Sequence, residues 1–290
     1  MSGTIYGNGD YRFEVVPDWG RGPRGVEKFG LISMVACDAQ DNVYVFQREP
    51  EPVMLVFQPD GTLIRRWGEA YFKHPHGIWI APDQTAYCTD RDRQTVAQWS
   101  LDGDLLHTWG TPDKAGADGA PFNEPTRAIV APNGDLYVSD GYGQHRAHRF
   151  AADGTLIRSW GEKGTGPGQF GWPVHSVTWH PQGRILIVDR ENNRIQHFTP
   201  EGNYLEEWND FDVPQDLFID PEGIIYIAEG RHPRITLMTL DGKVVSRWGE
   251  RGNDPGQFRA SPHACWVDRQ GSLYVGEVTT HDCFQKFVRR

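Results

Sequence analysis

Three histidines occupy the same position relative to a following turn, although they lie far apart in the chain. The segments are Pro75-His76-Gly77-Ile78, Val174-His175-Ser176-Val177 and Pro262-His263-Ala264-Cys265. Imidazole is a common zinc ligand, and three histidines with a vacant fourth position form the donor set of a catalytic zinc site. His76, His175 and His263 are therefore candidate metal ligands.

The elements that must position these histidines are internal repeats. Each copy has a Phe, a nearby Pro, an apolar strand, a turn, a second strand with an acidic end, a third strand, and a strand ending in Trp-Gly. The copies start near Leu31, Phe72, Phe122, Phe170, Phe211 and Phe258. Their spacing of about 40 to 50 residues is typical of a four-stranded propeller blade. The fixed Phe and Trp positions are expected to pack between blades.

The sixth copy lacks its closing strand, and the N-terminal residues Tyr11-Arg12-Phe13-Glu14-Val15-Val16 can supply it. Such closure removes the exposed edge of an open array. The sequence thus predicts an all-β chain, one domain over residues 1–290, folded as a six-bladed β-propeller closed by its N-terminal strand. Histidine stands in every second blade, and Ser33, Thr126 and Gln215 stand in the others. Three imidazoles about 120° apart in a six-bladed ring would converge on its axis.

The alternative is three unrelated histidines in a wet channel. If they do bind a metal, zinc is the first expectation, with iron, cobalt or manganese as alternatives. The other eight histidines lack this register, and most of them are expected on the surface or in loops. They are His74, His107, His145, His148, His180, His197, His232 and His281.

The second strand of each copy ends in a short polar loop. The recurring acids are expected to accept hydrogen bonds from loop backbone N–H groups, and they are Asp90, Asp140, Asp189, Glu229 and Glu277. The residues that differ between copies are better functional candidates: Arg48, Arg91, Tyr142 and Arg190. Arginine suits a carboxylate, and tyrosine beside a cation can act as a base. The alternative for each arginine is a salt bridge to a neighbouring loop acid.

Charge and composition exclude several classes of partner. A net charge of −10 argues against nucleic acid or an anionic membrane surface, and no apolar run approaches a membrane span. The N-terminus lacks a signal-peptide pattern, and the four cysteines lack a CxxC pair. We therefore expect reduced thiols, a cytoplasmic monomer and a small-molecule carboxylate substrate.

At these segments the chain resembles a known family. VDRENNRIQHF is typical of NHL repeats, and HPHGIWI, FNEPTRAIVAPNGDLYVSDGYG, VHSVTWHPQGRILIVDRENNRIQHF and SPHACWV are similar to the peptidyl-α-hydroxyglycine α-amidating lyases. The resemblance implies a catalytic zinc on His76, His175 and His263. It also implies that Tyr142, in SDGY, acts at the metal, and that Arg190, in DREN, and Arg48 match family arginines.

The chain also departs from the family pattern. Ala264 replaces an acid that helps to bind a structural calcium, so the resemblance gives no support for that ion. Gly143 replaces a cysteine, and Arg91 has no family equivalent.

Three functions follow as hypotheses. The first is a zinc lyase that cleaves the C–N bond of an N-acyl-α-hydroxyglycine-like hemiaminal to an amide and glyoxylate or a related α-keto acid. The second is a zinc-hydroxide hydrolase or hydratase on the same propeller, since fold alone does not fix the reaction. The third is a non-catalytic NHL interaction module, which gives no reason for three histidines in register.

Overall fold

The structure is a computed structural model that describes residues 4–290. This part of the chain contains twenty-five β-strands in six antiparallel sheets, and no α-helix. The fold is therefore a six-bladed β-propeller, as the repeats predict. No helical segment among the described residues has the length and apolarity of a membrane span. Contacts between residues divide the chain into two compact units, Ala70–Pro214 and the remainder.

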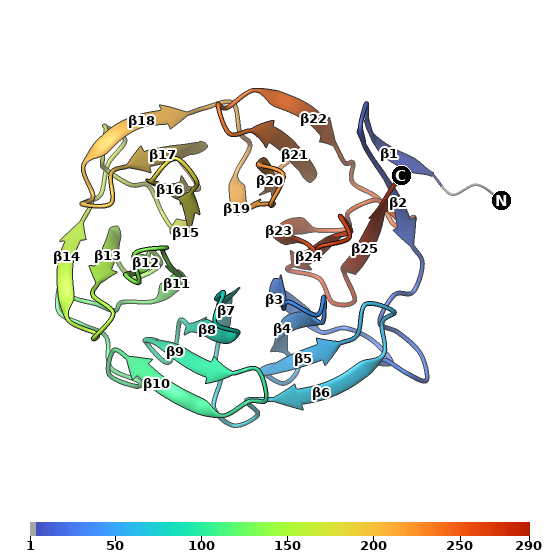
Figure 1. Cartoon of the computed structure of the whole chain (residues 1–290), viewed down its shortest axis with the longest axis horizontal. Helices are drawn as coiled ribbons and strands as arrows, with labels where there is room; N and C mark the ends of the chain where they lie inside the picture. Colours follow the sequence, from blue (N-terminus) through green and yellow to red (C-terminus); the bar gives the residue numbers. More distant parts are fainter. Residues whose placement is uncertain (1–3) are drawn as a thin grey trace. The chain divides into compact units, whose positions relative to one another are not determined.

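The unit Ala70–Pro214 holds three four-stranded sheets, drawn from cyan to gold in Figure 1. The first sheet consists of β7 (Pro75–Ile80), β8 (Thr85–Asp90), β9 (Thr95–Ser100) and β10 (Leu105–Trp109). The second consists of β11 (Pro125–Val130), β12 (Leu136–Asp140), β13 (Arg146–Phe150) and β14 (Leu156–Trp160). The third consists of β15 (Val174–His180), β16 (Arg184–Asp189), β17 (Arg194–Phe198) and β18 (Tyr204–Trp208). The first strands contact one another, β11 lying between β7 and β15.

The other unit holds the remaining three sheets. One consists of β3 (Leu31–Cys37), β4 (Val43–Glu49), β5 (Val53–Phe57) and β6 (Leu63–Trp67). The next consists of β19 (Pro214–Ile219), β20 (Ile224–Glu229), β21 (Arg234–Thr239) and β22 (Val244–Trp248). The last consists of β23 (Ser261–Val267), β24 (Leu273–Val278), β25 (Phe284–Arg289), β2 (Tyr11–Val16) and β1 (Ile5–Asn8).

The N-terminal strand completes the last sheet, as predicted. β2 pairs antiparallel with β25, with Phe13 opposite Arg289 and Val16 opposite Lys286. One element was not expected: β1 pairs with β2 and adds a fifth strand at the edge of this sheet. The short turn at Gly9, which has a positive φ of 55°, allows this hairpin.

The recurring aromatic residues pack between sheets, as predicted. In one unit, Trp160 at the end of β14 lies 6.0 Å from Phe198 of β17, measured between ring centroids, and Phe198 lies 5.8 Å from Phe170. In the other, Trp248 of β22 stacks on Phe258 at 6.1 Å. A large ring is thus buried between consecutive blades, where its apolar surface stabilises their packing.

The recurring acids Asp90, Asp140, Asp189 and Glu277 accept hydrogen bonds from loop backbone N–H groups, as predicted. Asp90 accepts from Lys73 N at 2.6 Å, and Asp189 accepts from Gly171 N at 2.7 Å. Asp140 and Glu277 make the same contact with Asn123 N and Ala260 N. Glu229 accepts hydrogen bonds from the side chains of Arg234 and Thr236. These acids tie the loop that enters each blade to the end of its second strand.

The structure also bears on two expectations from the sequence, one about the cysteines and one about the remaining histidines. All four cysteines are buried and none forms a disulfide, while their reduced state in the cell stays a prediction. Most of the other eight histidines lie on the surface or in loops, as expected, whereas His148, His180 and His197 are buried in strands β13, β15 and β17. His148 contacts the side chains of Asp140 and Ser159 on the neighbouring strands, and His197 packs against the Trp208 ring.

Candidate metal centre and active site

Each candidate metal ligand is the extra residue of a β-bulge. In β7 the pairing passes from Pro75 opposite Asp90 to Gly77 opposite Thr89, so that His76 has no partner in the ladder. The same shift leaves out His175 in β15 and His263 in β23. A bulge turns the side chain of its extra residue out of the regular alternation. The bulge therefore explains how a histidine in a paired strand is aimed away from the sheet.

The bulge belongs to the repeat and not to the histidine. The shift also occurs at Ser33 in β3 and at Thr126 in β11, which hold hydroxyl side chains. The backbone oxygens of these two residues accept hydrogen bonds from histidine Nδ1: Thr126 O from His76 at 2.8 Å, and Ser33 O from His263 at 2.6 Å. Blades without a histidine thus orient the histidines of their neighbours.

These hydrogen bonds fix the state of the rings. A carbonyl oxygen only accepts, so Nδ1 of His76 and of His263 carries the hydrogen, and Nε2 keeps its lone pair. A backbone partner on the second ring nitrogen is usual for metal-binding histidines. Gly77 makes the contact at His76 possible, because a Cβ there would lie 2.5 Å from Thr126 O.

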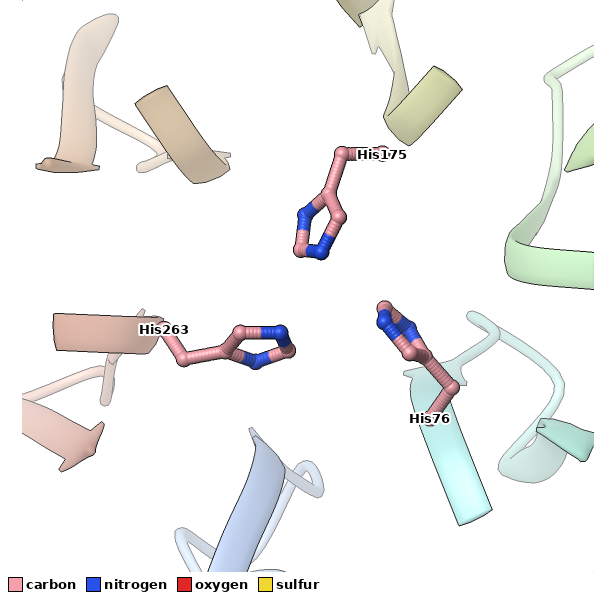
Figure 2. Close-up of side chains that lie close together, drawn as sticks. All are labelled: His76, His175 and His263. Atoms are coloured by element: carbon pink, nitrogen blue, oxygen red, sulfur yellow. The ribbon is translucent and has the colours of Figure 1, made fainter. Parts of the chain in front are cut away.

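The three histidines can share one cation. Their ligand atoms lie within 4.8 Å of one another, and the three side chains are 0%, 0% and 2% exposed (Figure 2). Three imidazole nitrogen donors suit zinc or a similar divalent metal. The residues therefore fit the metal that the sequence predicts, and the identity of the metal stays a prediction.

Tyr142 joins two of these histidines to a cationic group. Its hydroxyl oxygen lies 3.1 Å from Nε2 of His175, 3.4 Å from Nε2 of His76 and 3.4 Å from Nη1 of Arg190. The loop reaches this place because Gly141 packs against the start of β15, where a Cβ would lie 2.2 Å from both N and O of Val174. The phenol thus stands beside the candidate metal ligands.

The predicted arginines are placed differently from one another. The guanidinium of Arg91 lies over the Tyr142 ring, 3.8 Å from its centroid, and donates to Glu124 at 2.6 Å. Arg190 contacts the Tyr142 hydroxyl and also pairs with Glu191 at 3.2 Å. Arg48 lies near the end of β4, half-buried, in the other unit. Salt bridges to loop acids therefore occur at Arg91 and Arg190, while the assigned roles of all three arginines stay predictions.

Two residues at this site were missed by the sequence analysis. Glu124 holds the Arg91 guanidinium, and Trp172 donates from Nε1 to the backbone oxygen of Tyr142 at 2.9 Å. Trp172 occurs in FGWP, outside the recurring Trp-Gly positions. That departure from the repeat was the available signal, whereas nothing in the sequence pairs Glu124 with Arg91.

A second polar array resembles a serine triad but belongs to the repeat. His148 Nε2 lies 3.0 Å from Asp140 Oδ2, and its Nδ1 lies 2.7 Å from Ser159 Oγ. The equivalent strands of another blade connect Glu229, Thr236 and Arg247 in the same order. The array is therefore a cross-strand network that stabilises the sheet.

The sheets and the bulge-borne histidines define a six-bladed β-propeller of NHL-type repeats with a candidate metal centre. The chain is 33% identical to NHL repeat-containing protein 3 of Homo sapiens over 301 residues, which cover 96% of this chain and 84% of that protein. It belongs to the family of NHL repeat-containing protein 3. No protein-family model matches the chain.

The chain is also homologous to amidating lyases. It is 27% identical to peptidyl-alpha-hydroxyglycine alpha-amidating lyase 1 of Drosophila melanogaster over 92% of this chain and 59% of that protein, so it spans about three fifths of that relative. A gluconolactonase of Xanthomonas campestris has the same fold, with a TM-score of 0.67 and 14% identity over 97% of this chain and 91% of that one.

Proposed function

We propose that the protein is a metal-dependent lyase that cleaves the C–N bond of an N-acyl-α-hydroxyglycine-like hemiaminal. The products would be an amide and glyoxylate or a related α-keto acid. The observation that carries the proposal is the Tyr142 hydroxyl, 3.1 Å from Nε2 of His175 and 3.4 Å from Nη1 of Arg190. Homology to a protein named as an amidating lyase supports the same reaction class.

The metal would be held by Nε2 of His76, His175 and His263, whose ligand atoms lie within 4.8 Å of one another. When bound, it supplies a Lewis acid that polarises the substrate hydroxyl oxygen. Zinc is the proposed ion, because the donor set is three imidazoles.

Tyr142 is the proposed acid–base residue. Its phenolic oxygen accepts the proton of the substrate hydroxyl, and the electron pair of that O–H bond forms the C=O bond of glyoxylate. The C–N bond breaks, its electron pair stays on the amide nitrogen, and the same proton passes to that nitrogen. No further reactant is needed, so one substrate gives one amide and one glyoxylate.

The arginines divide into two proposed roles. Arg190, beside the Tyr142 hydroxyl, would bind the substrate carboxylate through its planar donor pair, with Arg48 as the second proposed carboxylate ligand. Arg91 instead would position Tyr142, because its guanidinium covers the phenol ring at 3.8 Å and is itself held by Glu124 at 2.6 Å. Cation–π contact of this kind stabilises one ring orientation.

The test is direct. Purified protein loaded with zinc is incubated with an N-acyl-α-hydroxyglycine, and the amide and glyoxylate are both quantified. We expect equal amounts of the two products, and their loss after chelation and return after zinc is restored. A fully metallated protein that releases no glyoxylate from any such substrate contradicts the proposal.

A further inference from the structure

Trp172 is exposed in a way that the repeat does not explain. Several large hydrophobic side chains are exposed among residues 4–290, and Trp172 is the aromatic one in this set. Its accessible fraction is 49%. Most of the aliphatic members lie on the fourth strands of the blades, and these are Ile64, Leu105, Leu106, Leu156, Ile157, Leu205 and Val244. The recurring aliphatic positions are thus a property of the fold, whereas Trp172 lies in one loop beside one site.

The indole is held in a fixed orientation. Its Nε1 donates to Tyr142 O at 2.9 Å, and its ring meets the Tyr142 ring edge-on, with centroids 5.4 Å apart and an interplanar angle of 86°. The Arg190 guanidinium carbon lies 5.1 Å from the centroid of the indole. An exposed tryptophan normally gains little from such order, because half of its apolar surface still faces water.

The spacing matches the acyl side of the proposed substrate. Across a trans amide the hemiaminal carbon and the first carbon of the acyl chain are about 3.8 Å apart, as two successive Cα atoms are. A substrate whose hydroxyl meets the Tyr142 oxygen and whose carboxylate meets Arg190 has only the acyl group left to place. The indole lies one ring-to-ring contact, 5.4 Å, from the phenol and touches the same arginine.

We infer that Trp172 is the specificity-determining platform for the acyl group, and that the preferred substrates carry an apolar or aromatic acyl group. This inference rests on the proposed function. Contact with the indole would remove roughly 50 Å² of apolar surface from water, which corresponds to about a tenfold preference for a hexanoyl or phenylacetyl group over acetyl.

Two substitutions separate the ring from its hydrogen bond. Trp172→Phe keeps an apolar ring and loses the donor to Tyr142 O, whereas Trp172→Gln keeps a donor and loses the ring. Leu106→Gln, at an exposed aliphatic position on β10, is the matched control. Each protein is tested with acetyl-, hexanoyl- and phenylacetyl-α-hydroxyglycine by initial rates. Binding of the corresponding N-acylglycines, which lack the hydroxyl that the proposed cleavage needs, is measured by calorimetry.

We expect wild type, Leu106→Gln and Trp172→Phe to favour the larger acyl groups about tenfold in KM and in calorimetric Kd. Trp172→Gln should bring this ratio to about one. If Trp172→Gln releases glyoxylate and keeps the full preference, the inference is wrong and the proposed function stands. If no protein releases glyoxylate but the Kd preference disappears only in Trp172→Gln, the platform is supported and the proposed reaction is wrong.

Discussion

Replacing Tyr142 with phenylalanine removes a single oxygen atom from the proposed active site. That oxygen lies 3.1 Å from Nε2 of His175 and 3.4 Å from Nη1 of Arg190. The ring is held independently of it, by Arg91 at 3.8 Å from its centroid and by Trp172 at 5.4 Å. We therefore expect the fold, the metal content and the ring position to be kept, while proton transfer is lost.

The expected loss in kcat is about 10²- to 10⁴-fold, the usual contribution of a positioned general base. This corresponds to about 3–5 kcal/mol in the activation free energy. The assay is glyoxylate release at saturating N-acyl-α-hydroxyglycine, with the melting temperature and the metal content measured on the same preparation. KM should change much less than kcat, because Arg190 and the acyl contact remain.

Tyr137→Phe is the matched control. Tyr137 lies on β12 of the same blade, and its hydroxyl donates to the backbone oxygen of Pro200 at 3.0 Å. It should be fully active and slightly less stable. A folded, metallated Tyr142→Phe protein whose kcat stays within about threefold of wild type would refute the reasoning. If that variant also hydrolysed esters or lactones at the wild-type rate, a zinc-hydroxide hydrolase would replace the lyase.

Three further outcomes are expected. We expect elemental analysis to find one transition metal per wild-type chain and none in His76→Ala, whereas His107→Ala, at an exposed position, should keep the metal. Gly141→Ala places a Cβ 2.2 Å from backbone atoms of Val174 and should lower the free energy of unfolding by about 1–3 kcal/mol in urea titrations; an unchanged value would contradict this close packing. Burial lowers the pKa of His197, which is 1% exposed, from 6.5 to about 4. The unfolded chain therefore takes up this proton first as the pH falls, so the ring's contribution is complete above pH 6.5 and is lost towards pH 4. In the wild type the free energy of unfolding should therefore fall by about 3 kcal/mol from pH 6.5 to pH 4, and in His197→Gln this fall should be absent. The same pH profile of stability in both proteins would contradict the lowered pKa of His197.

Most of the fold could be predicted because turn residues and aromatic residues recur at corresponding positions in the copies of the repeat. The Trp-Gly pairs correctly mark the ends of β6, β10, β14 and β22, and β2 was assigned to the last blade from its sequence. β1 was missed because Ile5–Asn8 is a short strand at the edge of its sheet. Which histidines are buried could not be foreseen, because the side chains that cover them, such as Trp208 against His197, come from neighbouring strands.

The candidate site was predicted in part. The shared register of His76, His175 and His263 follows from counting back from a turn, and the structure brings their ligand atoms together. The bulge at each histidine was not foreseen, since one extra residue in a strand changes no composition or period that the sequence displays. The contacts of Arg91 with Glu124 and of Trp172 with Tyr142 join neighbouring blades, so they depend on packing that no local pattern encodes.

The bulge has a consequence for how such proteins change over time. Thr126 and Ser33 occupy the same irregular position as the histidines without altering the ladder around them. A single codon change can therefore install or delete an imidazole there at little cost to the sheet. Relatives with the same fold can therefore differ in which side chains stand at the bulges. Whether such a relative can bind a metal has to be judged from the residue at each of these positions.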